Sequence, residues 1–593
     1  MFVMILLNCK VTEPKKLWDS IWEILAEDIQ YRQRQLYGDS ALKLNDEVLQ
    51  NYTLQEIEKI FWKHNRTLKE DEFSDIPYPD MFGMDNLKKG LNTKQKIAFN
   101  EISKSFEQND GRLFFVYGSG GIGKTYLWRT LIASLRSQGK IVLTVTSSGI
   151  ASLLLLGGRT AHSRFKIPLR LNETSCCNVS KKSPLAELLC KVDLIIWDEA
   201  PMIHMNALEP VQRALADLMM ETNKGKVLFG KKTLVLGGAF RKILPVTEEG
   251  TREDIVNASI SISRLWKHFT VFELTENMRL STGDASQDKR DEIEEFAKWI
   301  LDVGNGKVPA ISLDGSEDRD WIQIPSDLLI DYFINKRLDK EYLAERSILA
   351  PTNECVHKIN SLILSSVPGK GYTYLTYHTN ILFCLHLKYY YSHALSFVPG
   401  EERTYLSADS IGPESSEYHS SVVFYDKDFF NKHEESGMAS HKLTLKVGVP
   451  IMLLRNLSNA DGLCNGTRLI VKHLGQKYIE AEVLIGLGSG NTVFIPRIVM
   501  NTPETSFPFI LHRRQFPVRI CYAMTINKSQ GQSLPNVGVY LEEPIFSYGQ
   551  LYVSISRTIR RQGLKILIKK NGKEPDGYTQ NVVFEEIFQT LLN

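Results

Sequence analysis

The chain has 593 residues, of which 43% are hydrophobic and 24% are charged, the composition of an ordinary globular protein. Its length predicts roughly three or four domains, and its net charge of +2 decides neither for nor against nucleic acid, because a basic surface would have to be local. The eight cysteines include no C-x-x-C pair, which argues against a zinc site and favours a reducing compartment; no run of about 18 uncharged apolar residues is present, so no membrane span is predicted.

Residues 1–88 predict a helical prefix without catalytic motifs. Apolar residues recur at helical spacing between Leu17 and Ile29, and Leu54–Trp62 predicts a second helix. Met1–Asn8 is apolar but lacks a basic leader and a cleavage site, so it makes a poor signal peptide. Pro77–Pro79 is typical of a linker. A prefix packed on the next domain is favoured over an independent functional module.

The next helix is predicted to begin at Asn92 or Thr93, since both residue types can cap a helix, and to run to Phe106. Gln95 lies in its first turn, one helix before a glycine-rich loop. An amide side chain at this place can contact an adenine edge through two hydrogen bonds. The alternative is a surface glutamine, and the sequence gives the two interpretations equal weight.

A glycine-rich loop follows the buried strand Leu113–Tyr117 and precedes a helix, with the spacing G-x-x-x-x-G-K-T. Its glycines let the backbone approach phosphate oxygens, and the helix near Lys124 adds the positive end of its dipole. Lys124 is predicted to contact the β- and γ-phosphates, and Thr125 to contact Mg²⁺. A chance match is disfavoured by the flanking strand and helix. The predicted nucleotide-binding residues of the loop are Gly118, Ser119, Gly120, Gly121, Ile122, Gly123, Lys124 and Thr125.

Strands and helices alternate after this loop. Three apolar runs predict strands at Ile141–Val145, Leu194–Trp197 and Leu234–Leu236, and Ala151–Leu156 predicts a helix. Each strand ends in polar or glycine-containing sequence. The pattern therefore predicts a parallel α/β sheet that binds ligands at the carboxyl ends of its strands.

Two adjacent carboxylates, Asp198 and Glu199, end the strand Leu194–Trp197. A carboxylate at this place can hold Mg²⁺ through its water shell, and its neighbour can act as the general base for an attacking water. The alternative is two acids in an exposed turn. Four apolar residues directly before them favour the catalytic interpretation.

The second half of the chain predicts a further parallel sheet and a β-rich segment. Strands are expected at Arg346–Ala350, Val518–Met524 and Val537–Leu541, and Tyr552–Arg557 is expected on a helix. Short strands separated by Gly and Asn turns are expected between these elements, at Val447–Leu453, Arg468–His473, Ile479–Leu484 and Thr492–Ile495.

Ten motifs occur in order along the chain: GSGGIGKT, TVTSSGIAS with GGRTAHSRFKIP, LIIWDEAPM, LVLGG-FR-ILPV, LTENMRL, SILAPTN, LKVGVPIMLLRNL, LCNGTRL, FPVRICYAMTINKSQGQSL and YVSISRT. Together they resemble the Pif-type DNA helicases of superfamily one, the eukaryotic kin of bacterial RecD, over about 500 residues from Leu91 onward. Within that family the chain most resembles the helicases encoded by Helitron transposons and their relatives in plants, and the prefix, with LW-x-x-x-W and YRQRQ, also resembles theirs. Their nuclease, with its His-hydrophobic-His metal site, is not found in this sequence.

The resemblance implies two RecA-like parallel-sheet motor lobes, a small β-rich inserted domain and the helical prefix. The implied domains are a prefix at 1–88, a first lobe with the ATP site at 89–272, a second lobe at 273–369 and 511–593, and the β-rich domain at 401–510. Residues 370–400 interrupt the family pattern, and Lys370–Ser396 is interpreted as a translated intron or recent insertion, with a lineage-specific loop as the alternative.

The resemblance also assigns roles to single residues. ATP and Mg²⁺ would be held by Gln95, the glycine-rich loop, Asp198 and Glu199, and Arg279 and Arg557 would reach the γ-phosphate. The third motif departs from the family, which usually has Asp where Ala239 stands and Gln where Lys242 stands. Without the family, Arg557 would be assigned to a surface salt bridge. Single-stranded DNA would contact Ser147, Ser148, His162, Asn527, Lys528 and Ser529.

The expected function is an ATP-dependent helicase that moves 5′ to 3′ on single-stranded DNA and acts at duplex junctions, in DNA repair, recombination, telomere maintenance or transposon replication. The alternative is a transposon-derived remnant that binds ATP and DNA with little unwinding, because the third motif is altered. An ATPase acting on protein lacks a sequence feature in its favour. The expected location is the nucleus, with mitochondria as the alternative, and no membrane partner is expected.

Overall fold

The computed structural model gives the arrangement of most of the chain. Two of the sequence predictions, the role of Arg279 and the insertion at 370–396, lie outside the described residues. No helix among the described residues is long and apolar enough to cross a membrane. The described residues are 2–9, 11–37, 46–63, 66–68, 70–79, 84–155, 157–168, 171–219, 228–247, 250–278, 287–313, 320–330, 340–366, 402–411, 431, 437–458, 461–486, 488–502, 510–569 and 575–592.

The first lobe is built on a six-stranded parallel sheet with the order β3-β2-β4-β5-β1-β6. Its central strands are buried throughout and mostly apolar, because both faces of the sheet are covered. Phe114 packs on the side of α5 and α6, whereas Phe115 packs on the side of α9 and α10. The elements are α5 (Thr93–Gln108), β1 (Leu113–Tyr117), α6 (Lys124–Ser137), β2 (Val142–Thr146), β3 (Arg159–Thr160), α9 (Pro184–Lys191), β4 (Leu194–Asp198), α10 (Met205–Leu218), β5 (Thr233–Gly238) and β6 (Phe269–Glu273).

The second lobe is built on a smaller parallel sheet with the order β20-β9-β21-β22, and the two sheets together confirm the predicted α/β class. A three-stranded sheet, β23-β8-β7, lies beside it. The elements are α12 (Gln287–Gly304), β7 (Ala310–Ile311), β8 (Trp321–Gln323), β9 (Arg346–Ala350), α14 (Asn353–Ser366), β20 (Ala523–Thr525), β21 (Asn536–Leu541), α18 (Gln550–Ile555), β22 (Leu564–Ile568) and β23 (Tyr578–Gln580).

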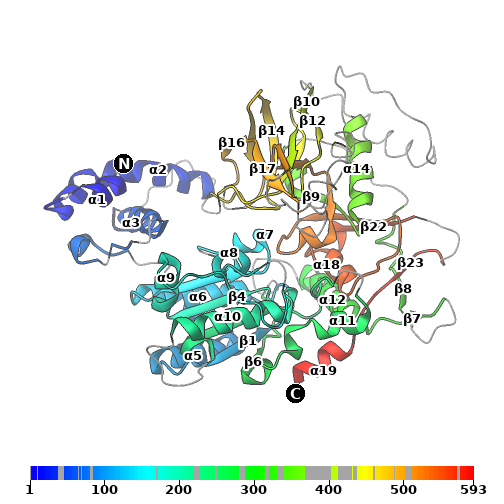
Figure 1. Ribbon diagram of the computed structural model, residues 1–593, viewed down its shortest axis with the longest axis horizontal. Helices are drawn as coiled ribbons and strands as arrows, with labels where there is room; N and C mark the ends of the chain where they lie inside the picture. The colour runs from blue at the N-terminus through cyan, green and yellow to red at the C-terminus, as the bar shows by residue number, and fades with distance from the viewer. Residues whose placement is uncertain are drawn as a thin grey trace.

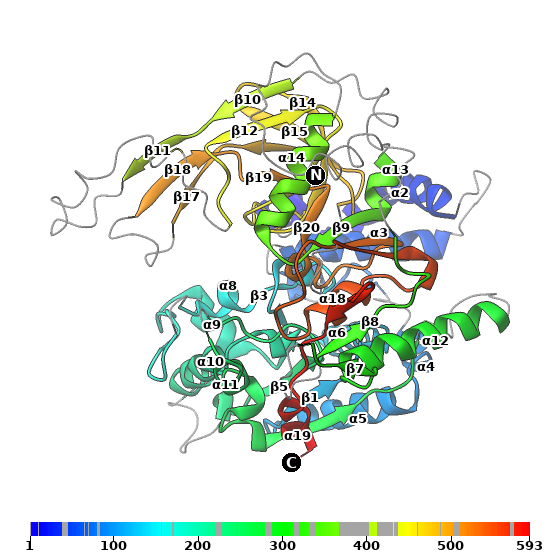
Figure 2. The same cartoon turned by 90° about the vertical axis from the view of Figure 1, so that its right-hand side faces the viewer.

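The β-rich domain stands above the second lobe in Figures 1 and 2, and the strands described in it pair antiparallel. The expected strand Val447–Leu453 begins only at Pro450, as β13, since Gly448, at φ +83°, turns the chain after β12 has ended at Lys446. The strands are β10 (Glu402–Leu406), β11 (Ala408–Ile411), β12 (Lys442–Lys446), β13 (Pro450–Leu453), β14 (Arg468–Leu474), β15 (Tyr478–Val483), β16 (Thr492–Pro496), β17 (Ile498–Asn501), β18 (Leu511–Gln515) and β19 (Val518–Ile520).

The β-rich domain extends beyond the expected limit at residue 510. β18 pairs with β11 and β17, and β19 pairs with β13 of the same domain. The expected strand Val518–Met524 is therefore divided between two sheets, because only β20 joins the motor sheet beside β9. A continuous apolar run does not reveal that its two halves pair with different neighbours.

The prefix forms its own small core and rests on the first lobe. It contains α1 (Phe2–Asn8), α2 (Pro14–Tyr37) and α3 (Asp46–Lys63), so the second helix begins eight residues before the expected Leu54. The buried Glu58 accepts hydrogen bonds from the Thr67 hydroxyl, at 2.6 Å, and the Leu68 amide, at 2.8 Å. Burial lowers the pKa of Arg136 in α6 to about 10, and the acidic groups of Tyr78 and Glu58 in the prefix partly oppose this shift. The prefix therefore lies against α6 of the first lobe.

The last described helix, α19 (Glu586–Leu592), returns to the first lobe at the bottom of Figure 2. Phe584 and Ile587 are buried in the same core as Trp266 of that lobe. The carboxylate of Glu586 accepts two hydrogen bonds from Arg252, at 3.0 and 2.8 Å. Residues near position 587 therefore help to close a core that is built mainly from residues 113–269.

Candidate functional site: a phosphate loop between two lobes

The glycine-rich loop joins β1 to α6, which begins at Lys124 as the sequence predicts. Gly121 and Gly123 have φ of +91° and +80°, a region that favours glycine. A Cβ at Gly123 would lie 2.4 Å from the Gln95 side-chain nitrogen. Substitution at Gly123 would therefore push the loop away from α5 and disturb its phosphate-binding shape.

Gln95 is fully buried and supports the loop. Its Oε1 accepts from the Asn92 amide in a capping box, and its Nε2 donates to the carbonyls of Ile122 and Gly123, at 3.2 and 3.3 Å. The surface-glutamine alternative is wrong for this structure. The expected adenine contact would require Gln95 to exchange these partners, so in the conformation seen here its role is to position the loop.

Lys124 points back into the loop, where its ammonium donates to the carbonyls of Gly118 and Ser119, the latter at 3.0 Å. Burial, followed by repulsion from Lys242, lowers the pKa of Lys124 to about 8. A buried cation beside backbone N–H groups and a helix N-terminus is suited to a phosphate chain. Thr125, the next residue, is half-buried at the start of the same helix.

Asp198 and Glu199 lie where β4 ends, at the carboxyl edge of the sheet. Burial, followed by the charge of Glu199, raises the pKa of Asp198. Asp198 Oδ1 and Glu199 Oε2 are buried and have no hydrogen-bond partner among the described residues. Carboxylate oxygens left without donors beside a phosphate loop are the ligands that Mg²⁺ prefers, so Asp198, with the Thr125 hydroxyl, fits a magnesium ion.

Lys242 forms an ion pair with the predicted base. Its Nζ lies 2.5 Å from Glu199 Oε1, and both side chains are buried. Burial alone would raise the pKa of Glu199, but Lys242, Lys124 and then Arg557 outweigh it, and the net shift is downward. Glu199 is thus held ionised, with one carboxylate oxygen occupied by Lys242.

Arg557 faces this site from the second lobe, just beyond the end of α18. Its guanidinium is buried and donates to the carbonyls of Val553, at 2.8 Å, and Gln532, at 3.0 Å. Its charge contributes to the lowered pKa of Glu199. The surface-salt-bridge alternative for Arg557 is therefore wrong, because its guanidinium is buried and bonded to carbonyls of its own lobe.

The loop after β5 touches the second lobe directly. The Tyr548 hydroxyl donates to the Phe240 carbonyl at 2.9 Å. Arg241 stacks over the Tyr117 ring at 5.3 Å and donates to Asn305 at 2.6 Å, so it has partners without a carboxylate at position 239. The third motif therefore joins the lobes by contacts that its sequence does not reveal.

Gly549 should not tolerate a side chain. Its φ is +67°, and a Cβ would lie 2.6 Å from the Arg241 carbonyl oxygen. We expect Gly549→Ala to separate this loop from α18 and to lower ATPase activity at least about tenfold, since small misplacements at a reaction centre carry costs of this size. Gly139→Ala is the matched control: φ is +76°, but nothing lies within 4 Å. Equal activity in both variants would show that the contact has no functional role.

Ser147, Ser148 and His162, the expected DNA contacts of the first lobe, lie beyond β2 and β3. Ser147 donates to the Glu199 carbonyl at 2.6 Å, and Ser148 caps α7 (Gly149–Ser152), which is shorter than the expected helix Ala151–Leu156. His162 is half-buried in α8 (Ala161–Phe165), and burial lowers its pKa. Ser147 therefore links the expected DNA side of the lobe to the predicted base.

The second-lobe DNA contacts lie in the 3₁₀ turn η6 (Ile526–Ser529). Asn527 is exposed and Lys528 is half-buried. The prediction for Ser529 is wrong in this conformation, because the residue is fully buried and its hydroxyl donates to the Ile526 carbonyl at 2.7 Å.

A cluster of cations surrounds Lys528. Burial, then repulsion from Arg519, lowers the pKa of Lys528 to about 8, and Arg455 acts in the same direction. Arg455 and Arg519 were not predicted from the sequence, because the strands that bring them here are far apart in the chain. Cations gathered on one surface favour phosphate contacts.

The short helix α7 touches both the second lobe and the β-rich domain. A Cβ at Gly149 would lie 3.1 Å from the Asn465 carbonyl, and one at Gly531 would lie 3.2 Å from Ala151. The three parts of the chain therefore meet on the side where the DNA contacts are predicted.

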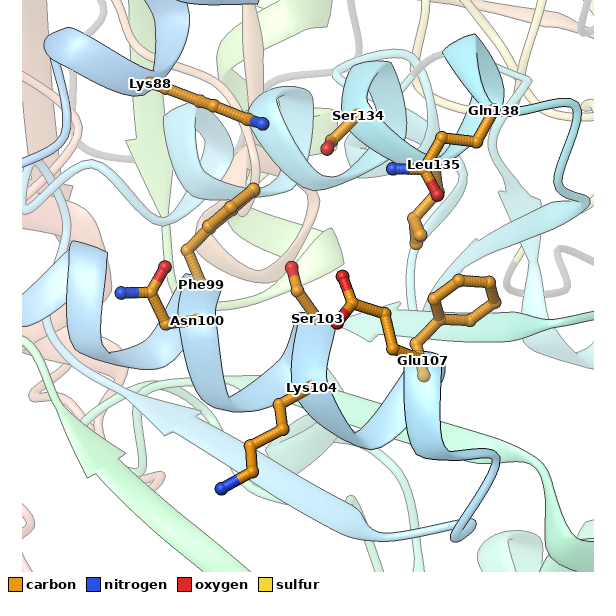
Figure 3. A pocket seen from close by; sticks show the side chains of 10 residues that line it. Lys88, Phe99, Asn100, Ser103, Lys104, Glu107, Ser134, Leu135 and Gln138 are labelled. Carbon is orange, nitrogen blue, oxygen red and sulfur yellow. The ribbon is translucent and has the colours of Figure 1, made fainter.

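A separate cavity of about 250 Å³ lies among α4 (Met84–Lys89), α5 and α6, and is shown in Figure 3. The Lys88 ammonium points across it, 5.6 Å from the centre of the Phe99 ring. None of the predicted site residues lines this cavity, so it is distinct from the nucleotide site.

Comparison with known proteins agrees with this arrangement. The sequence model of the PIF1-like helicase family matches residues 90–313, and that of the DNA helicase Pif1 2B domain matches residues 428–474. An ATP-dependent DNA helicase Pif1 from Campylobacter jejuni is 25% identical over 77% of this chain and 89% of its own length. The human ATP-dependent DNA helicase PIF1 is 23% identical over 80% of this chain, which spans 61% of the human protein.

Solved structures show the same fold. A Bacteroides Pif1 bound to single-stranded DNA aligns with 81% of this chain and 98% of its own, at a TM-score of 0.54 and 22% identity. The Candida albicans Pif1 helicase aligns at a TM-score of 0.53 and 20% identity, over 85% of this chain and 99% of its own. One family model matches the first lobe and another matches part of the β-rich domain, so both parts of the chain are similar to PIF1-like helicases.

Proposed function

We propose that this chain is an ATP-dependent DNA helicase that moves 5′ to 3′ on single-stranded DNA. The observation that carries the proposal is a buried site at the phosphate loop, where Lys124 and the Lys242–Glu199 ion pair lie and where the second lobe bonds to the loop after β5 through Tyr548. Relatives named ATP-dependent DNA helicase support the activity, and a Bacteroides Pif1 solved with ADP-AlF3 and single-stranded DNA supports both ligands. The 5′-to-3′ direction rests on the motif resemblance.

The residues of the nucleotide site have separate roles in ATP hydrolysis. Lys124 and the loop N–H groups bind and orient the phosphate chain, while Arg557 reaches toward it from the second lobe. Bound Mg²⁺ supplies charge neutralisation at the phosphates, and Asp198 and Thr125 are the residues that would hold it. Glu199 accepts a proton from the attacking water. Arg279, in the motif LTENMRL, is proposed as a second arginine that reaches the γ-phosphate.

DNA is proposed to cross both lobes on the side of α7 and η6. Lys528, with Arg455 and Arg519 beside it, would contact phosphates, while Ser148 and His162 line the first lobe. Contacts of this kind predict low sequence preference and binding that weakens steeply with salt. Ser147 is proposed to report DNA to the catalytic site through the Glu199 carbonyl.

A strand-displacement assay with 5′-tailed and 3′-tailed duplexes tests the proposal. We expect ATP-dependent unwinding of the 5′-tailed duplex and little of the 3′-tailed one. ATP hydrolysis that is stimulated by single-stranded DNA without any unwinding would favour a translocase. Hydrolysis that DNA leaves unchanged would contradict the proposal.

A second candidate is a remnant that binds ATP and DNA but unwinds poorly, and the Lys242–Glu199 ion pair favours it. The variant Ala239→Asp with Lys242→Gln should raise the DNA-stimulated kcat, because the amide can accept from the attacking water and frees Glu199. Ala239 is buried, so a new carboxylate there is costly, and Lys242→Gln alone is the cleaner variant. A kcat that does not rise in either variant would show that the natural third motif is fully competent.

We propose that the chain is related to Helitron-encoded helicases, because its prefix shares the LW-x-x-x-W pattern with them. We also propose that it is located in the nucleus, where such a helicase meets its DNA. Trp18 and Trp22, which carry the LW-x-x-x-W pattern, belong to a helix that packs in the core of the prefix. A fluorescent fusion of the full chain checks the location. Accumulation in mitochondria would contradict it.

A further inference from the structure

Two lysines and two carboxylates lie close together in the nucleotide site. Lys242 is paired with Glu199 in a buried ion pair, and beyond burial the pKa of Lys124 responds to the charges of Lys242, Glu199 and Asp198. A phosphate chain that enters must therefore compete with carboxylates for the lysines.

The two lysines are held differently. Lys124 bonds to carbonyls of its own loop, so phosphates can approach it without displacing a charged partner. Lys242 bonds to Glu199 Oε1 at 2.5 Å, and Glu199 is the predicted base. Because a base must lie beside the water that attacks the γ-phosphorus, the ammonium in contact with it lies near the γ-phosphate position, beyond a diphosphate.

The backbone that carries Lys242 is fixed, whereas its side chain can turn. Arg241 is anchored on Tyr117 and Asn305, and Gly549 packs against the carbonyls of Arg241 and Lys242. A lysine has a flexible four-carbon stem and a rotatable ammonium. Exchange of partner therefore needs no movement of the loop.

We propose that Lys242 is a γ-phosphate sensor that masks Glu199 until a nucleoside triphosphate binds. In the nucleotide-free chain the ammonium occupies one carboxylate oxygen of the base. A terminal phosphate takes over the ammonium, the Nζ–Oε1 contact is lost, and Glu199 becomes free to accept a proton from water. The proton on Lys242 stays in place throughout. A diphosphate leaves the ion pair intact, so the base is released only with a hydrolysable substrate.

This inference rests on the proposed function, and its test measures binding rather than turnover. Affinities for a non-hydrolysable ATP analogue and for ADP are measured with Mg²⁺ for the natural chain, Glu199→Gln, Lys242→Gln and the double variant. Lys267→Gln is the matched control, because it removes an equal charge from an exposed site of the same lobe. Thermal melting of each variant shows that it is folded.

We expect Glu199→Gln to tighten analogue binding by about tenfold and to leave ADP binding within about twofold, since a neutral amide competes for the Lys242 ammonium less strongly than a carboxylate does. Lys242→Gln should weaken analogue binding and leave ADP binding unchanged. In the Lys242→Gln background, Glu199→Gln should have no further effect.

Two results would overturn the inference. The first is tighter analogue binding by Glu199→Gln in both the natural and the Lys242→Gln backgrounds. That result would mean that Glu199 simply repels the phosphates and does not mask a base through Lys242. Equal tightening for ADP would place Lys242 away from the γ-phosphate. A natural chain that binds neither nucleotide would instead refute the proposed nucleotide site itself.

Discussion

Lys124→Ala should abolish measurable ATP hydrolysis. The structure buries this ammonium in the loop, where the carbonyls of Gly118 and Ser119 hold it, so the change removes the cation dedicated to the β- and γ-phosphates. Loss of one positioned group that stabilises transition-state charge costs about 10²–10³-fold in rate. Steady-state phosphate release with and without single-stranded DNA measures the effect.

A second lysine of the same lobe provides the comparison. Lys140 is exposed, 5.3 Å from the centre of the Phe106 ring, and lies outside the nucleotide site. Lys140→Ala should hydrolyse ATP at the natural rate. If Lys124→Ala also retained the natural rate, the glycine-rich loop would not be the active site.

Glu199→Gln should stop turnover while nucleotide binding persists. The amide keeps the shape of the carboxylate but cannot accept a proton from water, and general-base catalysis contributes about 10²–10⁴-fold in rate. The carbonyl bond from Ser147 does not involve the side chain and should survive the change. Single-turnover hydrolysis together with nucleotide binding separates the two effects.

Glu187→Gln is the control for this change. Glu187 pairs with Lys191 on the exposed side of α9, and such surface pairs contribute little to stability or function. Its turnover should be unchanged. Turnover retained in Glu199→Gln, with nucleotide affinity lost, would show that this carboxylate serves binding instead of proton transfer.

The pattern of neighbouring residues in the sequence was sufficient to predict much of the first lobe. The strands around Phe114, Val145 and Ile196 were predicted because a strand buried on both faces is mostly apolar. The positions of Lys124 and Asp198 followed from the same logic, since a phosphate loop and an acidic strand end are both set by neighbours in sequence. These features depend on a few consecutive residues, which a single sequence displays.

Contacts between distant residues could not be predicted. Lys242 reaches Glu199 across 43 positions in the chain, and the sequence showed only that a lysine stood where a glutamine was expected. Ser529 was expected to face DNA, but the turn geometry of η6 directs its hydroxyl inward. The position of Gly549 against the third motif likewise depends on how two lobes meet, which no local pattern contains.

The return of the chain to its first lobe bears on the order in which the protein forms during synthesis. β9 is synthesised before the β-rich domain, whereas its neighbour β20 is synthesised after it. The second sheet therefore cannot be completed until the whole β-rich domain has been synthesised. The core of the first lobe is completed later still, because Phe584 and Ile587 are part of it. Until those residues leave the ribosome, the apolar surface around Trp266 stays exposed to solvent. Slow translation of the second half would prolong the interval in which chaperones or neighbouring nascent chains can bind that surface.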